Sequence, residues 1–165
     1  MSTGFAPGRR VVGAVADGGR CIGLVVGDNG DVSSAQSDGQ TFYDAIGGHE
    51  TIKRIVDRFY EGVASDPVLR AMYPEEDLGP ANRRLRMFLE QYWGGPTTYS
   101  QERGHPRLRM RHAPFAVTPE SKERWLLHFR AGLDEVALPP ELDAQFWDYV
   151  NHAAMFMVNS PSESV

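Results

Sequence analysis

From residue 41 onward, apolar residues recur every three to four positions, which is the period of one side of an α-helix. The first such stretch carries Ile52, Ile55, Val56, Phe59, Tyr60 and Val63. Ser65-Asp66-Pro67 ends it and begins a short helix, because Asp66 is a good cap and Pro67 is tolerated in a first turn. The pattern predicts an amphipathic helix followed by a much shorter one.

Further helical stretches follow along the chain. The next has apolar residues at Leu85, Phe88, Leu89 and Tyr92 and ends at Gly94-Gly95-Pro96. The segment 96–106 is predicted to be irregular, and an irregular connection of this length inside a domain is usually functional or mobile. It leads into a short basic segment, 107–112.

Two proline-led helices close the chain. Thr118-Pro119-Glu120 begins one of them and Pro139-Pro140 begins the other, while Asn159-Ser160-Pro161 ends the last. Their apolar positions are Trp125, Phe129, Leu133 and Val136 in the first, and Leu142, Phe146, Val150, Ala153 and Met157 in the second. No strand pattern occurs after residue 41. The sequence therefore predicts an all-α domain over 41–165, with few and rather short helices.

Residues 1–40 do not show the helical pattern of the rest of the chain. Two short apolar runs, 11–16 and 21–26, flank Asp17-Gly18-Gly19-Arg20, which suits a tight turn. A lone hairpin is marginally stable in water, so we expect a loosely structured extension, flexible or forming a weak hairpin, rather than a functional module. A further hypothesis is that translation starts at the valine codon of position 32, close to the helical region, because a valine codon can serve as a bacterial start.

Composition narrows the function classes. The chain has 17 Lys and Arg against 22 Asp and Glu, a net charge of −5, which does not favour nucleic-acid binding. Cys21 is the single cysteine, so an intrachain disulfide and a cysteine-rich zinc site are both excluded. No apolar run approaches the roughly 20 residues that span a bilayer. We therefore expect a soluble, cytoplasmic protein with no membrane partner.

Histidines are the natural candidates for metal chemistry. His49 is expected to face water near a helix start, and both His128 and His152 lie on amphipathic helices, where surface or hydrogen-bonded core positions are the usual situation. A zinc site from His105, His112 and Glu102 is conceivable, but Pro106 interrupts the helix that such a spacing would require.

His112 has a distinctive neighbourhood. Three arginines precede it and Ala113-Pro114-Phe115 follows. Haem requires a neutral imidazole for iron, apolar and aromatic walls, and cations for two propionates, and this segment offers all three. An ordinary surface histidine in a solvated basic loop explains the same residues equally well, so the local composition leaves both interpretations open.

Three strings resemble a known family. Residues 42–48 (FYDAIGG) resemble the opening of truncated haemoglobins, while 84–96 (RLRMFLEQYWGGP) and 104–115 (GHPRLRMRHAPF) resemble group II of that family. The resemblance runs from about residue 42 to about residue 161 and excludes 1–40. It implies a two-over-two helical globin fold that binds haem b, in which His112 is the iron ligand. It also implies that Arg84, Arg111 and, more weakly, Tyr99 contact the propionates. The walls implied are Leu85, Phe88, Leu108 and Phe115.

The same resemblance also implies which residues lie on the other side of the haem, where a gas would bind. Tyr60 and Tyr73 match two tyrosines on the gas-binding side, Trp125 matches a tryptophan there, and Ala81 falls where many globins have a histidine. Phenol and indole groups must then supply the hydrogen bonds to a bound gas. Taken without the resemblance, Tyr60 and Trp125 would be ordinary core residues and Tyr73 a surface loop residue.

Three functions follow as hypotheses. The first is the binding of dioxygen and other diatomic gases at five-coordinate haem iron, for transport or storage. The second is a redox enzyme, a nitric oxide dioxygenase or a peroxidase, which would require a reductase that the sequence does not identify. The third is a helical partner-binding scaffold without haem. The sequence leaves a homo-oligomer open.

Overall fold

The computed structural model describes residues 15–17, 20–22, 25–26, 32–33 and 39–161 of the chain. Its helices are α1 (Phe42–Ala45), α2 (Gly48–Ser65), α3 (Pro67–Arg70), α4 (Gly79–Tyr92), α5 (Thr98–Arg103), α6 (Leu108–His112), α7 (Pro119–Val136) and α8 (Pro140–Met157). The part of the chain described from residue 39 onward contains no strand, in agreement with the predicted all-α domain.

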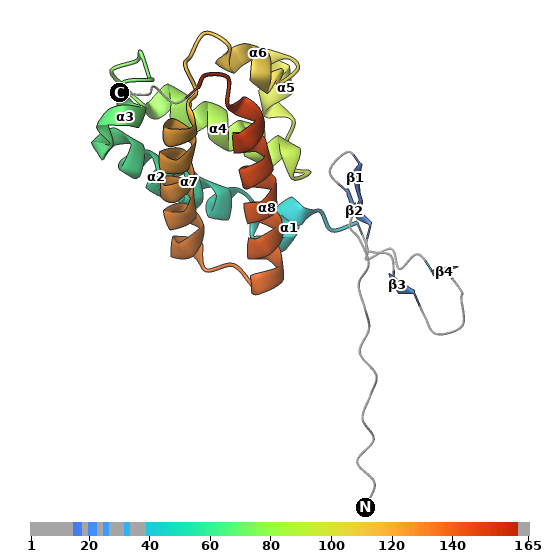
Figure 1. Ribbon diagram of the computed structural model, residues 1–165. Coiled ribbons are helices and arrows are strands. Elements are labelled where there is room, and N and C mark those ends of the chain that lie inside the picture. The colour runs from blue at the N-terminus through green and yellow to red at the C-terminus, as the bar shows by residue number, and fades with distance from the viewer. Residues whose placement is uncertain (1–14, 18–19, 23–24, 27–31, 34–38, 162–165) are drawn as a thin grey trace, which may run out of the picture.

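Four short strands precede the helices and are drawn apart from them in Figure 1. β1 (Val15–Asp17) pairs antiparallel with β2 (Arg20–Ile22), so that Val15 lies opposite Ile22, and β3 (Val25–Val26) pairs with β4 (Val32–Ser33). The first pair joins the two apolar runs for which a hairpin was expected. The remaining residues of this region lie outside the described part of the chain, and the extension's role stays a prediction.

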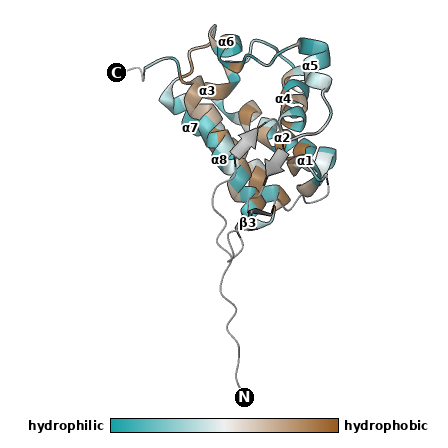
Figure 2. Ribbon diagram, turned by 90° about the vertical axis from the view of Figure 1, so that its right-hand side faces the viewer, coloured by the Kyte–Doolittle hydropathy of each residue, from teal (hydrophilic) through white to brown (hydrophobic). Residues whose placement is uncertain are grey.

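The helical body consists of two pairs of helices. α2 packs against α4 and, most extensively, against α7, while α7 packs against α8 (Figure 1). The core between them is aromatic and aliphatic. Its largest fully buried side chains are Phe59, Phe129, Phe146, Ile52, Ile55, Leu133, Val56 and Val63. Brown and teal segments alternate along the helices in Figure 2, as expected of helices that bury one side.

Local signals set the helix ends where the sequence predicted them. The Asp66 carboxylate accepts hydrogen bonds from the amides of Val68 and Leu69 and caps α3. Thr118 caps α7 through a capping box with Ser121. Pro140 stands in the first turn of α8, where its missing N–H is not needed.

Two expectations about helix content were wrong. Segment 96–106 was expected to be irregular, but it contains α5. This short helix is held by tertiary contacts: Gln91 hydrogen-bonds both the amide (2.9 Å) and the hydroxyl (2.7 Å) of Ser100, and Tyr99 is buried. The helices are also not all short, since α2, α7 and α8 have 18 residues each.

Candidate functional site

A cavity of about 550 Å³ lies within the helical body. Its lining comes from α2 through α8, so it is bounded by both helix pairs and by the short helices. All eleven predicted site residues line it: Tyr60, Tyr73, Arg84, Leu85, Phe88, Tyr99, Leu108, Arg111, His112, Phe115 and Trp125. Ala81, the position without a histidine, lines it as well. Residues spread over 66 positions of sequence therefore meet at one hollow.

His112 is the last residue of α6, and its ring is half-buried. The ring atom Nδ1 lies 2.7 Å from the carbonyl oxygen of Leu108, one turn earlier. A carbonyl oxygen can only accept a hydrogen bond, so Nδ1 carries a proton and Nε2 is the ring nitrogen that faces no hydrogen-bond partner. A histidine oriented in this way by a backbone carbonyl binds a metal through its other ring nitrogen.

The loop after His112 is tied to the end of the chain. The side-chain amide of Asn159 donates to the carbonyl oxygens of His112 (3.2 Å) and Phe115 (2.9 Å). Its oxygen accepts from the Val117 amide at 3.0 Å, and the backbone amides of Asn159 and Ser160 both donate to the Val117 carbonyl. One side chain, 47 residues away in sequence, thus holds the segment that carries His112.

Tyr60, Tyr73 and Trp125 gather in one part of the cavity. Tyr60 and Tyr73 meet edge to face with ring centroids 5.8 Å apart, and Trp125 stacks on Phe129 at 5.0 Å. The Tyr73 hydroxyl also interacts with the hydroxyl of Tyr60 and with the indole of Trp125, and both interactions influence its pKa. Two phenol hydroxyls and one indole N–H therefore meet in this part of the cavity.

Burial keeps these phenols protonated. It raises the pKa of Tyr60 far above the ordinary value, and the neighbouring Tyr73 raises it further. Burial also raises the pKa of Tyr73, although the hydrogen bonds from Tyr60 and Trp125 act in the opposite direction. Both hydroxyls therefore remain neutral donors throughout the physiological pH range.

Cationic side chains border the cavity, but the two predicted propionate contacts already have partners. Arg84 pairs with Glu75 at 3.0 Å, and the Arg111 guanidinium donates to the carbonyl oxygens of Arg103 and Pro106. An acidic group that enters at this border would compete with Glu75 for Arg84. Two further cations, Arg103 and Lys122, line the cavity without having been predicted.

One wall of the cavity was not predicted from the sequence. α8 contributes Tyr149, Val150, Ala153, Ala154 and Met157, and the segment after α2 contributes Leu69 and Met72. The helical period of Val150, Ala153 and Met157 was visible in the sequence. It indicates burial, but it does not distinguish a wall of a ligand cavity from solid core.

The remaining histidines take other roles. His128 is hydrogen-bonded through Nε2 to the buried Asp66 carboxylate at 2.9 Å, and His152 is exposed. His49 is exposed, as expected, and its Nδ1 also lies 2.6 Å from the buried carboxylate of Glu90. The conceivable zinc site loses its carboxylate, because Glu102 forms a two-pronged ion pair with Arg83 at 2.6 Å. Among the described residues no group of three potential ligands is placed to hold a metal ion.

The residues present fit a haem. The cavity offers one imidazole with a free Nε2, apolar walls in Leu85, Phe88 and Leu108, and cations along its border. The cavity volume lies within the range that binds small molecules and cofactors.

None of the helices in the described part of the chain is long and apolar enough to cross a membrane.

Helix pairs enclosing a cavity with a single oriented imidazole define the class of small haem-binding globins. The family described as bacterial-like globin matches residues 41–159, and the chain belongs to this family, within its group II truncated haemoglobins. Its fold is the two-over-two globin fold. The family binds haem and diatomic gases, and so does this chain.

Individual relatives support this assignment. The group 2 truncated haemoglobin YjbI of Bacillus subtilis (strain 168) is 42% identical over 124 residues, which cover 73% of this chain and 92% of the relative. The solved thermostable haemoglobin of Thermobifida fusca is 63% identical, with a TM-score of 0.72, covering 73% of this chain and 98% of that one. The solved truncated oxygen-avid haemoglobin of Bacillus subtilis is 41% identical, with a TM-score of 0.69, covering 73% of this chain and all of that one.

Proposed function

We propose that this protein binds dioxygen at a haem b held by His112 and releases it slowly. The observation that carries the proposal is the hydrogen bond from His112 Nδ1 to the Leu108 carbonyl, which leaves Nε2 of a cavity-lining ring to bind iron. When bound, haem b would supply the iron that takes up a diatomic gas. Leu85, Phe88, Leu108 and Phe115 would enclose the macrocycle, and Tyr99 would lie near the propionates.

Slow release follows from the donors around the gas-binding space. Bound dioxygen carries partial negative charge on its outer atom, and a hydrogen bond to a charged group contributes roughly 1.5–3 kcal/mol. The hydroxyls of Tyr60 and Tyr73 and the indole N–H of Trp125 would be such donors. The Bacillus subtilis relative of the same fold is named as oxygen-avid, which agrees with this expectation.

A redox enzyme is the second candidate. The observation that favours it is the same set of donors, because a protein that releases oxygen slowly delivers it poorly. Preorganised donors also stabilise developing negative charge, as nitric oxide dioxygenation to nitrate and peroxide cleavage both require. This candidate needs a reductase to return ferric iron to the ferrous form.

An absorption spectrum of the protein reconstituted with haem tests the first claim. We expect a five-coordinate ferrous spectrum that His112→Ala abolishes, whereas His105→Ala, which alters an exposed ring seven residues earlier, leaves it unchanged. The claim fails if no Soret band appears or if His112→Ala keeps the normal spectrum.

Stopped-flow measurements then separate the two candidates. Fast oxygen release with moderate affinity indicates a carrier. Very slow release combined with rapid loss of the oxy form on addition of nitric oxide indicates the enzyme.

A further inference from the structure

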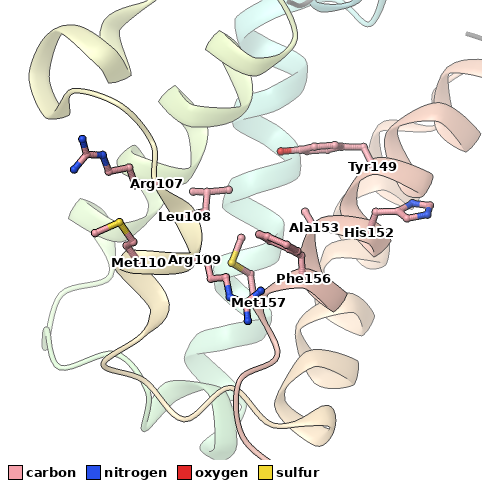
Figure 3. A pocket seen from close by; sticks show the side chains of 9 residues that line it. All are labelled: Arg107, Leu108, Arg109, Met110, Tyr149, His152, Ala153, Phe156 and Met157. Atoms are coloured by element: carbon pink, nitrogen blue, oxygen red, sulfur yellow. The ribbon is translucent and has the colours of Figure 1, made fainter. Parts of the chain in front are cut away.

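A second hollow of about 620 Å³ opens between α6 and α8, on the outer side of the haem cavity. Figure 3 shows the side chains that line this groove: Arg107, Leu108, Arg109, Met110, Tyr149, His152, Ala153, Phe156 and Met157. Four of them, Leu108, Tyr149, Ala153 and Met157, also line the haem cavity. A single layer of side chains therefore separates the groove from the cavity.

The groove exposes large apolar side chains. Met110 is 67% exposed and Phe156 is 59% exposed, and the neighbouring Met155 is also exposed. Single exposed apolar residues are common, but a group that lines one groove is typical of an interaction surface. Methionine side chains adapt to the shape of a partner.

The charge around the groove is opposite to that of the whole chain. Residues 103–119 contain four arginines and no Asp or Glu, in a chain of net charge −5. Arg107 and Arg109 are exposed, and neither forms an ion pair with a carboxylate in the described part of the chain; Arg109 lies over the ring of Phe156 at 5.1 Å. On α8 the segment 148–157 carries one acidic residue, Asp148. Two free guanidinium groups thus flank an apolar centre.

We propose that this groove is the docking surface for an acidic electron-carrier protein that reduces the haem. Free arginines around an apolar centre complement a partner with carboxylates around its own redox centre, and such complementarity steers encounter. Electron-transfer contacts are small and transient, which suits one groove. The carrier loses one electron and ferric iron gains it, so the exchange balances without a proton. This inference rests on the proposed function, because the electron is delivered to the haem that His112 is proposed to hold.

An acidic plant-type [2Fe–2S] ferredoxin serves as the probe, because its low potential allows it to reduce haem. The rate of reduction of the ferric protein is followed by stopped flow at low and at high ionic strength. We expect the double variant Arg107→Gln/Arg109→Gln to lower the second-order rate constant about ten-fold at low salt and to flatten its salt dependence. Met110→Ser should lower the rate constant at both salt concentrations.

The matched control is Arg54→Gln/Arg58→Gln on α2. It removes the same charge from residues outside the groove, at the expense of surface ion pairs with Glu135 and Glu61. Its rate constant should stay within about two-fold of the wild-type value. Dithionite, which needs no docking site, should reduce all variants at the same rate. Equal effects of the two double variants, or no effect of either, would overturn the proposal.

Binding without electron transfer separates this proposal from the proposed function. Oxidised ferredoxin added to the chain, with or without haem, should shift the methyl NMR signals of Met110 and Met157, and Arg107→Gln/Arg109→Gln should abolish the shifts. A missing Soret band defeats the proposed function, whereas unshifted methyl signals defeat the docking surface. A dimer in sedimentation that Met110→Ser dissociates would assign the groove to a second copy of the chain and overturn the proposal.

Discussion

At the scale of single residues, the protein places one acceptor and several donors around one cavity. His112 leaves Nε2 as the ring nitrogen for a metal because Nδ1 is engaged by the Leu108 carbonyl. Tyr73 and Trp125 supply O–H and N–H groups, and burial holds the pKa of Tyr73 above its ordinary value so that its proton is retained. In the proposed function, the residues on the two sides of the site have opposite tasks, one to hold iron and the other to hold a gas.

Trp125→Phe tests the donor role of the indole. The ring that stacks on Phe129 is largely kept, but the N–H is lost. We expect oxygen release to become about ten-fold faster or more, since a hydrogen bond to a charged group contributes ~1.5–3 kcal/mol. Trp147→Phe, a change at a tryptophan of α8 that does not line the cavity, is the control. An unchanged release rate in Trp125→Phe, measured by stopped flow, would remove Trp125 from the gas-binding side.

At the scale of elements, short helices depend on contacts made far along the chain. α6 has five residues, too few to be stable by itself, and Arg107 enters it in a left-handed conformation with φ of +42°. Its C-terminal end is held by Asn159, just beyond the end of α8. The orientation of His112 is therefore a property of α6 together with the end of the chain.

Asn159→Ala should loosen the segment that carries His112. Three hydrogen bonds are lost, those to the His112 carbonyl, the Phe115 carbonyl and the Val117 amide. We expect the haem dissociation rate to rise roughly three- to ten-fold and the Val117 amide to exchange faster in hydrogen–deuterium exchange. The control Asn151→Ala removes one hydrogen bond within α8, to the Trp147 carbonyl. If both variants lose haem at the wild-type rate, Asn159 has no positioning role.

The contact between α2 and α7 depends on glycine. A Cβ at Gly132 would lie 2.5 Å from the carbonyl oxygen of Ile55, and one at Gly62 would lie 2.3 Å from Nδ1 of His128. Because each of these close approaches involves the opposite helix, the two helices are closer than side chains at these positions would allow.

Gly132→Ala should destabilise the fold, although alanine stabilises a helix interior by up to ~1 kcal/mol relative to glycine. The backbone of α2 cannot move aside cheaply, so we expect the free energy of unfolding to fall by about 1–3 kcal/mol in urea denaturation. Gly79→Ala at the start of α4, where the nearest atom is a side-chain oxygen of Asp77 at 3.1 Å, is the tolerated control. A variant as stable as the wild type would show that the contact relaxes.

At the scale of the whole molecule, buried Asp66 connects three helices. It follows α2, caps α3, and accepts hydrogen bonds from His128 at 2.9 Å and from Arg124 at 3.5 Å, both on α7. α3 leads to Tyr73 and α7 carries Trp125, so this junction joins the elements that hold the gas-binding side. Burial by itself raises the pKa of Asp66, but the hydrogen bonds from His128 and the α3 amides outweigh it and hold this pKa below the ordinary value.

This depressed pKa predicts how stability depends on pH. The ionised carboxylate stabilises the fold above its unfolded pKa near 3.8, and this contribution is lost as the pH falls through the lower folded value. Asp66→Asn should therefore lower the free energy of unfolding at pH 7, by about 1–3 kcal/mol, and the gap to the wild type should shrink below about pH 4.

Urea denaturation from pH 7 to pH 3 measures this gap. The control Asp134→Asn removes an exposed ion pair with Arg130 and should change stability by less than about 1 kcal/mol at any pH. A gap that is the same at pH 7 and pH 3 would contradict the role assigned to the Asp66 carboxylate.

Sequence alone determined the all-α class, several ends of the long helices and the candidate residues of the site. These depend on local features, such as the cap at Asp66, the prolines at 119 and 140 and the apolar period of α2, or on strings that resemble a family. Each candidate was assigned by its position within the resemblance, which runs from about residue 42 to about residue 161, and all eleven line the cavity.

Tertiary structure alone decided the rest. It formed α5 through Gln91 and Ser100, placed Glu75 against Arg84, tied Asn159 to the loop of His112 and brought α8 to the cavity wall. It also created the groove between α6 and α8. The physical reason is that each of these features joins residues separated in sequence by a loop or a helix, and no periodicity of a single segment records which distant partner will meet it.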